Sequence, residues 1–438
     1  MISLERRLFC LWIFYKYMQR KIGQNRKEWY DYMKRLIYLD HAATTQPFPE
    51  VLDAMIPYYS RYYGNPSSGY ELGEESKRAI ETAWGQIADT LGVEDDTIYF
   101  TSGGTESDNW ALRYAVQNGK RRRPHIVTSS IEHHAILNTC KNLEKQGVRV
   151  TYLPVNKEGT VQPEMVERAI ISDTVLVSVM YANNEIGSIQ PIRQIGQITH
   201  RKQVLFHTDA VQAAGHVEID LTKLQADFLS VSAHKFHGPK GCGFLYVKNG
   251  FRTESLLEGG AQEKGMRAGT ENVPGIVGMA AALEESLINR DKKDTFVLEL
   301  RRQVAERLLS IEGSHLNGCG VMEDGEGAAA GTDAAARHAG TAVSRADRLC
   351  GNLNISFDGI EAEALLLYLD MKGVSVSAGA ACSAGALEPS HVLTAMGISP
   401  ELAKGTIRIS LDETNTQEDA EFLMEVIPDA VAHLRSMA

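Results

Sequence analysis

Short runs of β-branched or apolar residues alternate with longer stretches of helical periodicity between residues 80 and 290. Two of the helical stretches cover residues 75–92 and 192–202. Strands that alternate with helices predict a mostly parallel sheet with helices packed against both of its faces. The predicted strands cover residues 97–100, 125–129, 148–155, 174–181, 203–210, 227–233 and 243–247. We therefore expect an α/β fold built on a mostly parallel, seven-stranded sheet.

The pattern changes near residue 292. Residues 295–311 predict a long amphipathic helix that could connect two domains. A chain of 438 residues is too long for one hydrophobic core, so we expect a large domain over residues 36–292 and a smaller α+β domain over residues 293–438. Residues 36–50 are expected to pack with the small domain. The predicted elements of that domain cover residues 352–357, 361–373, 374–377 and 406–411.

Two segments lie outside the predicted helices and strands: an insert within the small domain and the N-terminal extension. Residues 323–346 are rich in Ala and Gly and lack apolar periodicity, so we interpret them as a flexible surface insert. Residues 1–35 are basic, and residues 8–15 are apolar like the start of a signal peptide, but no small-residue cleavage site follows. Eight apolar residues are also far fewer than the roughly 20 that span a bilayer. We interpret residues 1–35 as a dispensable extension before a natural start at Met33; a basic presequence is the alternative.

Charge and cysteine usage narrow the functional classes. The formal net charge of −11 argues against direct nucleic-acid binding, and nothing in the pattern indicates a membrane protein. The six cysteines are scattered, without a CxxC pair or a zinc-ligand spacing. Free thiols suit a reducing compartment, so we expect a cytoplasmic protein with no metal in its active site.

Lys235 is the strongest single candidate for chemistry. It follows an apolar predicted strand and precedes the tight turn formed by His237, Gly238 and Pro239. A lysine at the mouth of a buried strand is costly unless it is solvated or used. A lysine near apolar walls can lose its proton and bond covalently to an aldehyde. The obvious biological aldehyde is pyridoxal phosphate (PLP), although a lysine that simply reaches solvent is the plainer interpretation.

The other requirements of PLP are met elsewhere in the chain. Asp209 ends a predicted parallel strand, where an acid can pair with the ring nitrogen, and Gln212 could reach the ring hydroxyl. The phosphate needs backbone N–H groups and hydroxyls at a helix start, which Gly104 and Thr105 supply after a strand. The remaining candidate phosphate ligands, on one side of the strand before Lys235, are Ser232 and His234. A nucleotide-binding loop is excluded because the GxxxxGK[ST] and GxGxxG patterns are absent.

His133 opens a predicted helix and is the better of two adjacent histidines to lie over a planar cofactor. A surface or helix-capping histidine is the alternative for this motif taken alone. A metal site built from His133, His134, His234 and His237 does not fit known ligand spacings.

From Ile37 to Ser410 the chain resembles the group I cysteine desulfurases, the iron–sulfur-cluster and nitrogenase type within the class V aminotransferase family. Many motifs in one order make this resemblance specific. The matching motifs are YLDHAATT (38–45), NPSS (65–68), TSGGTESDN (101–109), EHHAIL (132–137), ANNEIGSIQPI (182–192), HTDAVQ (207–212), SAHKFHGPKGCG (232–243), GGAQEKGMRAGTEN (259–272), NISF (354–357), SAGAACSAG (377–385), EPSHVL (388–393) and IRIS (407–410).

The resemblance implies a PLP-dependent transferase of fold type I that acts on L-cysteine as a homodimer. Lys235 would hold PLP and move protons, while His133 would stack on the ring and assist proton transfer. Thr270 of the second subunit would join the phosphate ligands. Asn184 and Arg408 would hold the substrate carboxylate, a role that suits the planar fork of arginine.

The resemblance further implies that Cys382 is the nucleophile. It would remove sulfur from the substrate to leave alanine and a persulfide. The persulfide sulfur would pass to a protein acceptor, in iron–sulfur cluster assembly or in a thio-cofactor or tRNA thiolation pathway. Cys382 lies in a segment of small residues, 377–390, and a tether of this kind could serve both the pocket and an outside acceptor.

Two rival interpretations remain at this level. A related PLP enzyme of the same fold, such as an aminotransferase or a selenocysteine lyase, would share residues 100–240 but would not need the Cys382 thiol. A non-catalytic sulfur scaffold would not need Lys235, Asp209, His133 and Cys382 together.

Overall fold

A computed structural model describes residues 36–119, 121–248, 255–320, 347–378 and 389–437. The predicted insert 323–346 and the extension 1–35 lie outside these residues. Of the segment 377–390, the structure describes residues 377, 378, 389 and 390, and Cys382 lies outside the described part. Within the described ranges, no helix is both long enough and apolar enough to cross a bilayer.

The largest element is a seven-stranded sheet with the strand order β2-β8-β7-β6-β5-β3-β4. Strands β7, β6, β5, β3 and β4 run parallel to one another, whereas β8 is antiparallel to both β2 and β7. The predicted α/β fold with a mostly parallel sheet is therefore confirmed. The strands are β2 (Ile98–Thr101), β3 (His125–Ser129), β4 (Arg149–Leu153), β5 (Thr174–Ser178), β6 (Leu205–Asp209), β7 (Phe228–Ser232) and β8 (Gly243–Val247).

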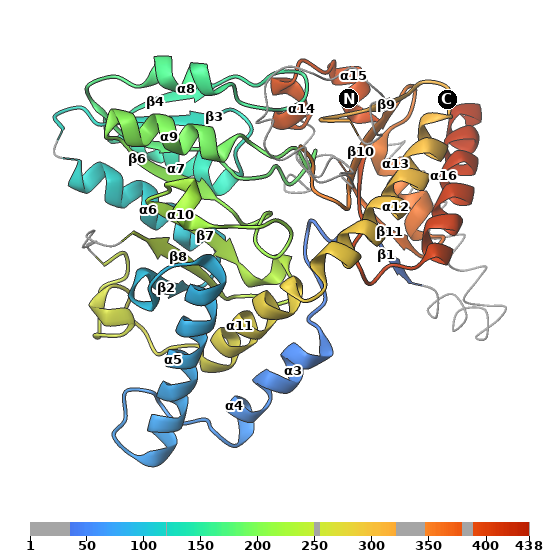
Figure 1. Cartoon of the computed structure of the whole chain (residues 1–438). Helices are drawn as coiled ribbons and strands as arrows, with labels where there is room; N and C mark the ends of the chain where they lie inside the picture. The colour runs from blue at the N-terminus through green and yellow to red at the C-terminus, as the bar shows by residue number, and fades with distance from the viewer. Residues whose placement is uncertain (1–35, 120, 249–254, 321–346, 379–388, 438) are drawn as a thin grey trace.

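Side chains alternate between the two faces of this sheet, as the period of a strand requires. On β3, Ile126 joins one hydrophobic cluster and Val127 joins another, and on β7 Phe228 and Leu229 divide in the same way. Helices α6 (Gly104–Asn118) and α7 (His134–Lys145) cover the first face. Helices α5 (Glu71–Leu91), α9 (Ile192–Lys202) and α11 (Val273–Leu287) cover the second (Figure 1).

A smaller sheet lies beside the large one and has the order β12-β13-β10-β9 (Figure 1). The apolar side chains of β10 and β13, such as Leu353 and Ile409, pack under the long helices α12 and α16. The strands are β9 (Ser314–Leu316), β10 (Asn352–Phe357), β12 (Ser377–Ala378) and β13 (Thr406–Ser410), and the helices are α12 (Arg290–Leu309), α13 (Ala362–Asp370), α14 (His391–Ala395), α15 (Pro400–Lys404) and α16 (Gln417–Met437).

The single strand expected over residues 374–377 is wrong. The structure divides this segment into β11 (Val374–Ser375), which pairs in parallel with β1 (Ile37–Tyr38), and β12, which pairs with β13. Residues 374 and 375 thus pair with β1, the first strand of the chain, and no local pattern in residues 374–377 could reveal that partner.

The N-terminal segment ties the two sheets together. Ile37 and Leu39 belong to the hydrophobic cluster of the small sheet, while the backbone N–H of Thr45 donates to the carbonyl of His234 in the large one. The predicted boundary near residue 292 falls in the first turn of α12, and the two-domain division stays a prediction. The remaining helices, around the large sheet, are α3 (Pro49–Met55), α4 (Pro57–Ser60), α8 (Pro163–Ala169) and α10 (Leu221–Leu224).

Candidate active site

Lys235 lies at the end of the short 3-10 turn Ala233–Lys235, directly after β7. Its Nζ donates to the carbonyl oxygens of Ala42 (2.6 Å) and Ala43 (2.8 Å), which come from the N-terminal segment. His216 bonds to the backbone oxygen of Lys235 at 2.8 Å. The amino group is thus held at the carboxyl edge of the sheet, where ligand sites of open α/β sheets form.

A cavity of about 440 Å³ opens in front of the start of α6. The capping residue Gly103 and the first helical residue Gly104 leave the backbone bare, and N–H groups at a helix start favour an anion. The only carboxylate in the lining, Glu106, is already paired with Arg267 at 2.9 Å. The lining residues are Ala43, Thr44, Ser102, Gly103, Gly104, Thr105, Glu106, Ser232, His234, Lys240 and Gly241. The four predicted phosphate ligands Gly104, Thr105, Ser232 and His234 are therefore brought together.

Asp209 is buried at the end of β6, and one of its carboxylate oxygens accepts a bond from the N–H of Val211 (2.9 Å). Burial raises the pKa of Asp209 to about 6, with the Val211 N–H and the Lys235 ammonium opposing the rise. The group is still mainly ionised at neutral pH, as a partner for a protonated ring nitrogen must be. Gln212 is buried nearby, and its amide donates to the carbonyl of Ala42 (2.9 Å).

His133 caps the N-terminus of α7, where its Nδ1 accepts a bond from the N–H of Ala135 (3.2 Å). Since Nδ1 accepts, any proton on the neutral ring sits on Nε2. Burial, aided by the Lys235 ammonium and His134, lowers the pKa of His133 to about 4. The ring is therefore uncharged at neutral pH. His133 therefore caps the helix, as the alternative interpretation proposed, and a capping histidine can still stack on a cofactor ring.

The two predicted substrate ligands meet in the structure. Arg408, in β13, is only 1% exposed, and its Nη1 donates to the backbone carbonyl of Asn184 (2.8 Å). Its Nη2 donates to the Asp40 carboxylate at 2.7 Å. The Arg408 side chain thus connects β13 of the small sheet to the loop after β5.

Two predicted residues are not placed with the others. Thr270 is exposed and is not among the residues that line the cavity. Cys382 lies outside the described residues. Both roles stay predictions.

Sequence reasoning missed the part played by the segment after Tyr38. It supplies the carbonyls of Ala42 and Ala43 to Lys235, and Asp40 to Arg408. The only signal was the motif YLDHAATT, which carries the family resemblance but shows no local reason for these contacts.

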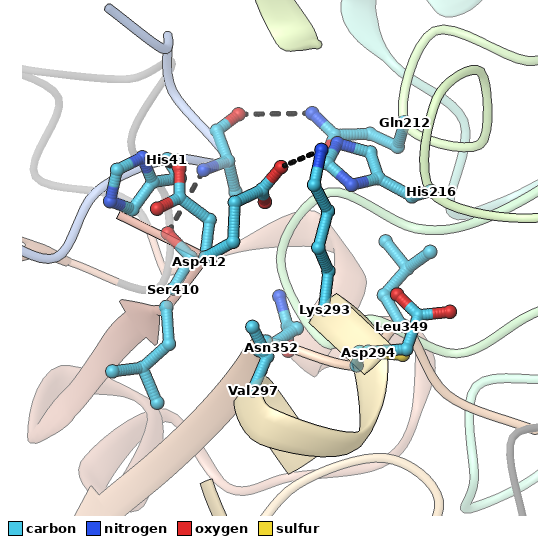
Figure 2. A pocket seen from close by; sticks show the side chains of 15 residues that line it. His41, Gln212, His216, Lys293, Asp294, Val297, Leu349, Asn352, Ser410 and Asp412 are labelled. Carbon is cyan, nitrogen blue, oxygen red and sulfur yellow. Dashed lines mark hydrogen bonds and ion pairs between the residues drawn. The ribbon is translucent and has the colours of Figure 1, made fainter. Parts of the chain in front are cut away.

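A second group that sequence reasoning missed is the buried cluster of His41, His237 and Asp412. Asp412 Oδ2 is 2.5 Å from His41 Nδ1 and 3.2 Å from His237 Nε2, and all three side chains are buried. Figure 2 shows His41, Gln212 and Asp412 around a small adjoining cavity of about 50 Å³. Ligand atoms of His237, Asp412 and Glu413 lie within 4.8 Å of one another; His237 pairs with Asp412, and Glu413 pairs with Lys293.

These donors fit one cofactor. Lys235 carries an amino group that can bond to an aldehyde, Asp209 can face a ring nitrogen, and the glycine backbone at Gly103 and Gly104 leaves space for a phosphate. A Cβ at Gly103 would stand 3.3 Å from the Ser232 hydroxyl and fill this cradle. Together they describe a PLP enzyme, and the chain belongs to the class V aminotransferases, whose sequence model, Aminotransferase class-V, matches residues 37–330 and 334–423.

Within that family, the chain belongs to the cysteine desulfurases. It is 49% identical over 404 residues to the cysteine desulfurase IscS of Methanosarcina thermophila, covering 92% of this chain and 94% of that protein. A solved structure of a NifS-like protein superposes with a TM-score of 0.81 at 36% identity, covering 91% of this chain and all of that one. The solved structure of SspA in complex with cysteine gives a TM-score of 0.71 at 33% identity, covering 86% and 99%.

Proposed function

We propose that this enzyme removes sulfur from L-cysteine, releases L-alanine, and passes the sulfur through a persulfide on Cys382 to a protein acceptor. The observation that carries the proposal is the meeting of Lys235, the buried Asp209 and the phosphate cradle at one edge of the sheet. The structural neighbour SspA, solved with cysteine, supports the substrate assignment.

The cofactor residues divide into three roles. Lys235 would hold PLP, which supplies an electron sink next to the substrate carbon. Asp209 would keep the ring nitrogen protonated and Gln212 would contact the ring oxygen. The residues that would bind the phosphate are Gly104, Thr105, Ser232 and His234, with Thr270 of a second subunit.

Proton movement would fall to two side chains. Lys235 Nζ would take and return the proton of the substrate Cα, and Ala42 and Ala43 hold this nitrogen in place through their carbonyls. His133 would stack on the ring. Because its pKa is lowered to about 4, its Nε2–H could donate a hydrogen bond without adding positive charge to the site.

The substrate would be oriented by its carboxylate, which Arg408 and the side chain of Asn184 would bind. The Cys382 thiolate would then attack the substrate sulfur. An S–S bond forms as the carbon–sulfur bond breaks, the electron pair of that bond stays with carbon, and protonation there completes alanine. A thiol of an iron–sulfur scaffold or thiolation enzyme would next attack the outer sulfur of the persulfide.

We further propose that the enzyme is a homodimer in the cytoplasm. Large apolar side chains are exposed on α3, on α4 and in the segment before α5. These elements lie at the lower edge in Figure 1. Contiguous apolar patches on a surface mark association sites. The exposed residues are Leu52, Ile56, Tyr59, Tyr63 and Tyr70, and each is at least 44% exposed. A second copy on this face would shield these side chains and could bring the exposed Thr270 to the other phosphate cradle.

Two variants test the proposed function. Lys235→Ala should yield colourless protein, whereas purified wild type should be yellow with bound PLP; a PLP-free wild type would remove the assignment. Cys382→Ser should retain PLP and bind L-cysteine but release no sulfide in the presence of a thiol reductant. Unchanged sulfide release would move the nucleophile elsewhere, and formation of a keto acid in place of alanine would indicate an aminotransferase.

A further inference from the structure

Asp40 is the only carboxylate within ion-pair distance of Arg408 among the residues that the structure describes. The Asp40 Oδ1 accepts from Arg408 Nη2 at 2.7 Å, and the carboxylate is 17% exposed. Its other oxygen, Oδ2, accepts from the Ser377 hydroxyl at 2.8 Å. Ser377 is also the cross-strand partner of Arg408, so one carboxylate bridges two neighbouring strands of the small sheet.

These contacts leave part of the arginine fork available. Nη1 is bonded to the carbonyl of Asn184 and Nη2 to Asp40, while the buried Nε has no hydrogen-bond partner among the residues that the structure describes. A guanidinium has five N–H donors, so a ligand carboxylate could bind without displacing Asp40. Two carboxylates would then share one positive charge in a site with little water, where their repulsion is weakly screened.

We propose that Asp40 is a positioning residue that fixes the guanidinium of Arg408 and weakens its grip on carboxylate ligands. This inference rests on the proposed function, which gives Arg408 the substrate carboxylate. Asp40 balances the buried charge while the site is empty of substrate. Its negative charge also limits the affinity for the product L-alanine, which carries the same carboxylate as the substrate and must leave before the next turnover.

The test measures binding of L-alanine to the PLP-loaded enzyme by calorimetry, so no turnover is needed. Asp40→Asn keeps the shape and one acceptor but removes the charge. It should lower the Kd for L-alanine by about tenfold. Ethylamine, which lacks a carboxylate, should bind wild type and variant equally. Asp40→Glu should restore the wild-type Kd. If Asp40→Asn does not retain PLP, Asp40→Ser removes the same charge and takes its place.

Two matched variants separate the explanations. Ser377→Ala removes the hydrogen bond to Asp40 but keeps the charge, and it should leave the Kd for L-alanine unchanged. An unchanged or raised Kd in Asp40→Asn, while Arg408→Gln weakens L-alanine binding selectively, would overturn the inference and leave the proposed function intact. If Arg408→Gln does not weaken L-alanine relative to ethylamine, the carboxylate site itself is wrongly assigned.

Discussion

Replacing Asp412 by Asn tests how much the buried cluster of His41, His237 and Asp412 contributes to stability. A carbonyl oxygen can only accept, so His41 donates through Nε2 to Tyr38 and His237 donates through Nδ1 to Gln46. The second nitrogen of each ring faces Asp412 Oδ2. The contact of His237 with Asp412 is a charged hydrogen bond while the His237 ring is protonated. Since both rings and the carboxylate are buried, removing the negative charge should cost about 3–5 kcal/mol of unfolding free energy.

The cost should depend on pH. Although burial opposes it, the Asp412 carboxylate raises the pKa of His237 above its ordinary 6.5, so this contribution is complete below 6.5 and disappears as pH rises through the folded value. Burial likewise opposes the fall in the pKa of Asp412, but His237 and His41 hold it far below its ordinary 3.8. The stabilisation is therefore greatest between about pH 4 and pH 6.5. Above the folded pKa of His237, the new carboxamide can donate to the unprotonated Nε2 of that ring, and the variant should recover.

The assay is thermal unfolding of wild type and Asp412→Asn at pH 5.5 and pH 8.5, at one protein concentration because an oligomer would respond to dilution. The matched control is Asp173→Asn, which breaks the exposed ion pair with Arg149 (2.8 Å) and should cost less than about 1 kcal/mol at either pH. An equal loss of stability at the two pH values, or a loss no greater than that of the control, would refute the reasoning.

Three further changes have defined outcomes. In Gly104→Ala the new Cβ would lie 2.4 Å from Val211 Cγ2, so we expect lower PLP occupancy, measured by absorbance after denaturation; full occupancy would contradict the cradle. Burial raises the pKa of Glu132 to about 8, so wild type loses stability from pH 4.5 to 8 and Glu132→Gln does not. The melting temperature of that variant relative to wild type should therefore rise between pH 5 and pH 8, and a constant difference would count against a buried, protonated Glu132. The double change Tyr59→Glu and Tyr63→Glu should yield monomers in light scattering at unchanged secondary structure by circular dichroism, and a persistent dimer would exclude the face that carries these tyrosines as the interface.

Most strands of the large sheet could be predicted from the sequence because they are buried on both faces, the edge strand β4 being the exception. Residues 228–232 and 243–247 are continuous runs without exposed positions, and such runs keep their identity whatever packs on them. The strands of the small sheet were harder to predict, because one predicted strand divides between two different partners. Residues 374–377 divide between two sheets only because β1, more than 330 positions away, pairs with one half.

The site residues likewise divide into those that local sequence pattern could identify and those that it could not. Lys235, Asp209 and Gly104 end a strand or open a helix, so local pattern and chemistry were enough to select them. Arg408 and Asn184 needed the family resemblance. Asp40, His41 and Asp412 could not be found from either, because their importance comes from partners that the chain brings close only when folded.

The sequence by itself indicated the class of the enzyme: alternating strands and helices predict the sheet, a lysine, an acid and a glycine turn near strand ends favour PLP, and the family motifs make the assignment specific. Only the tertiary structure decided how the charges are held. Residues 40–45 cross from the small sheet to the large one and supply the partners of Arg408 and Lys235. Contacts between residues hundreds of positions apart leave no periodic trace in a sequence, because they depend on packing of the whole chain and not on local conformational preference.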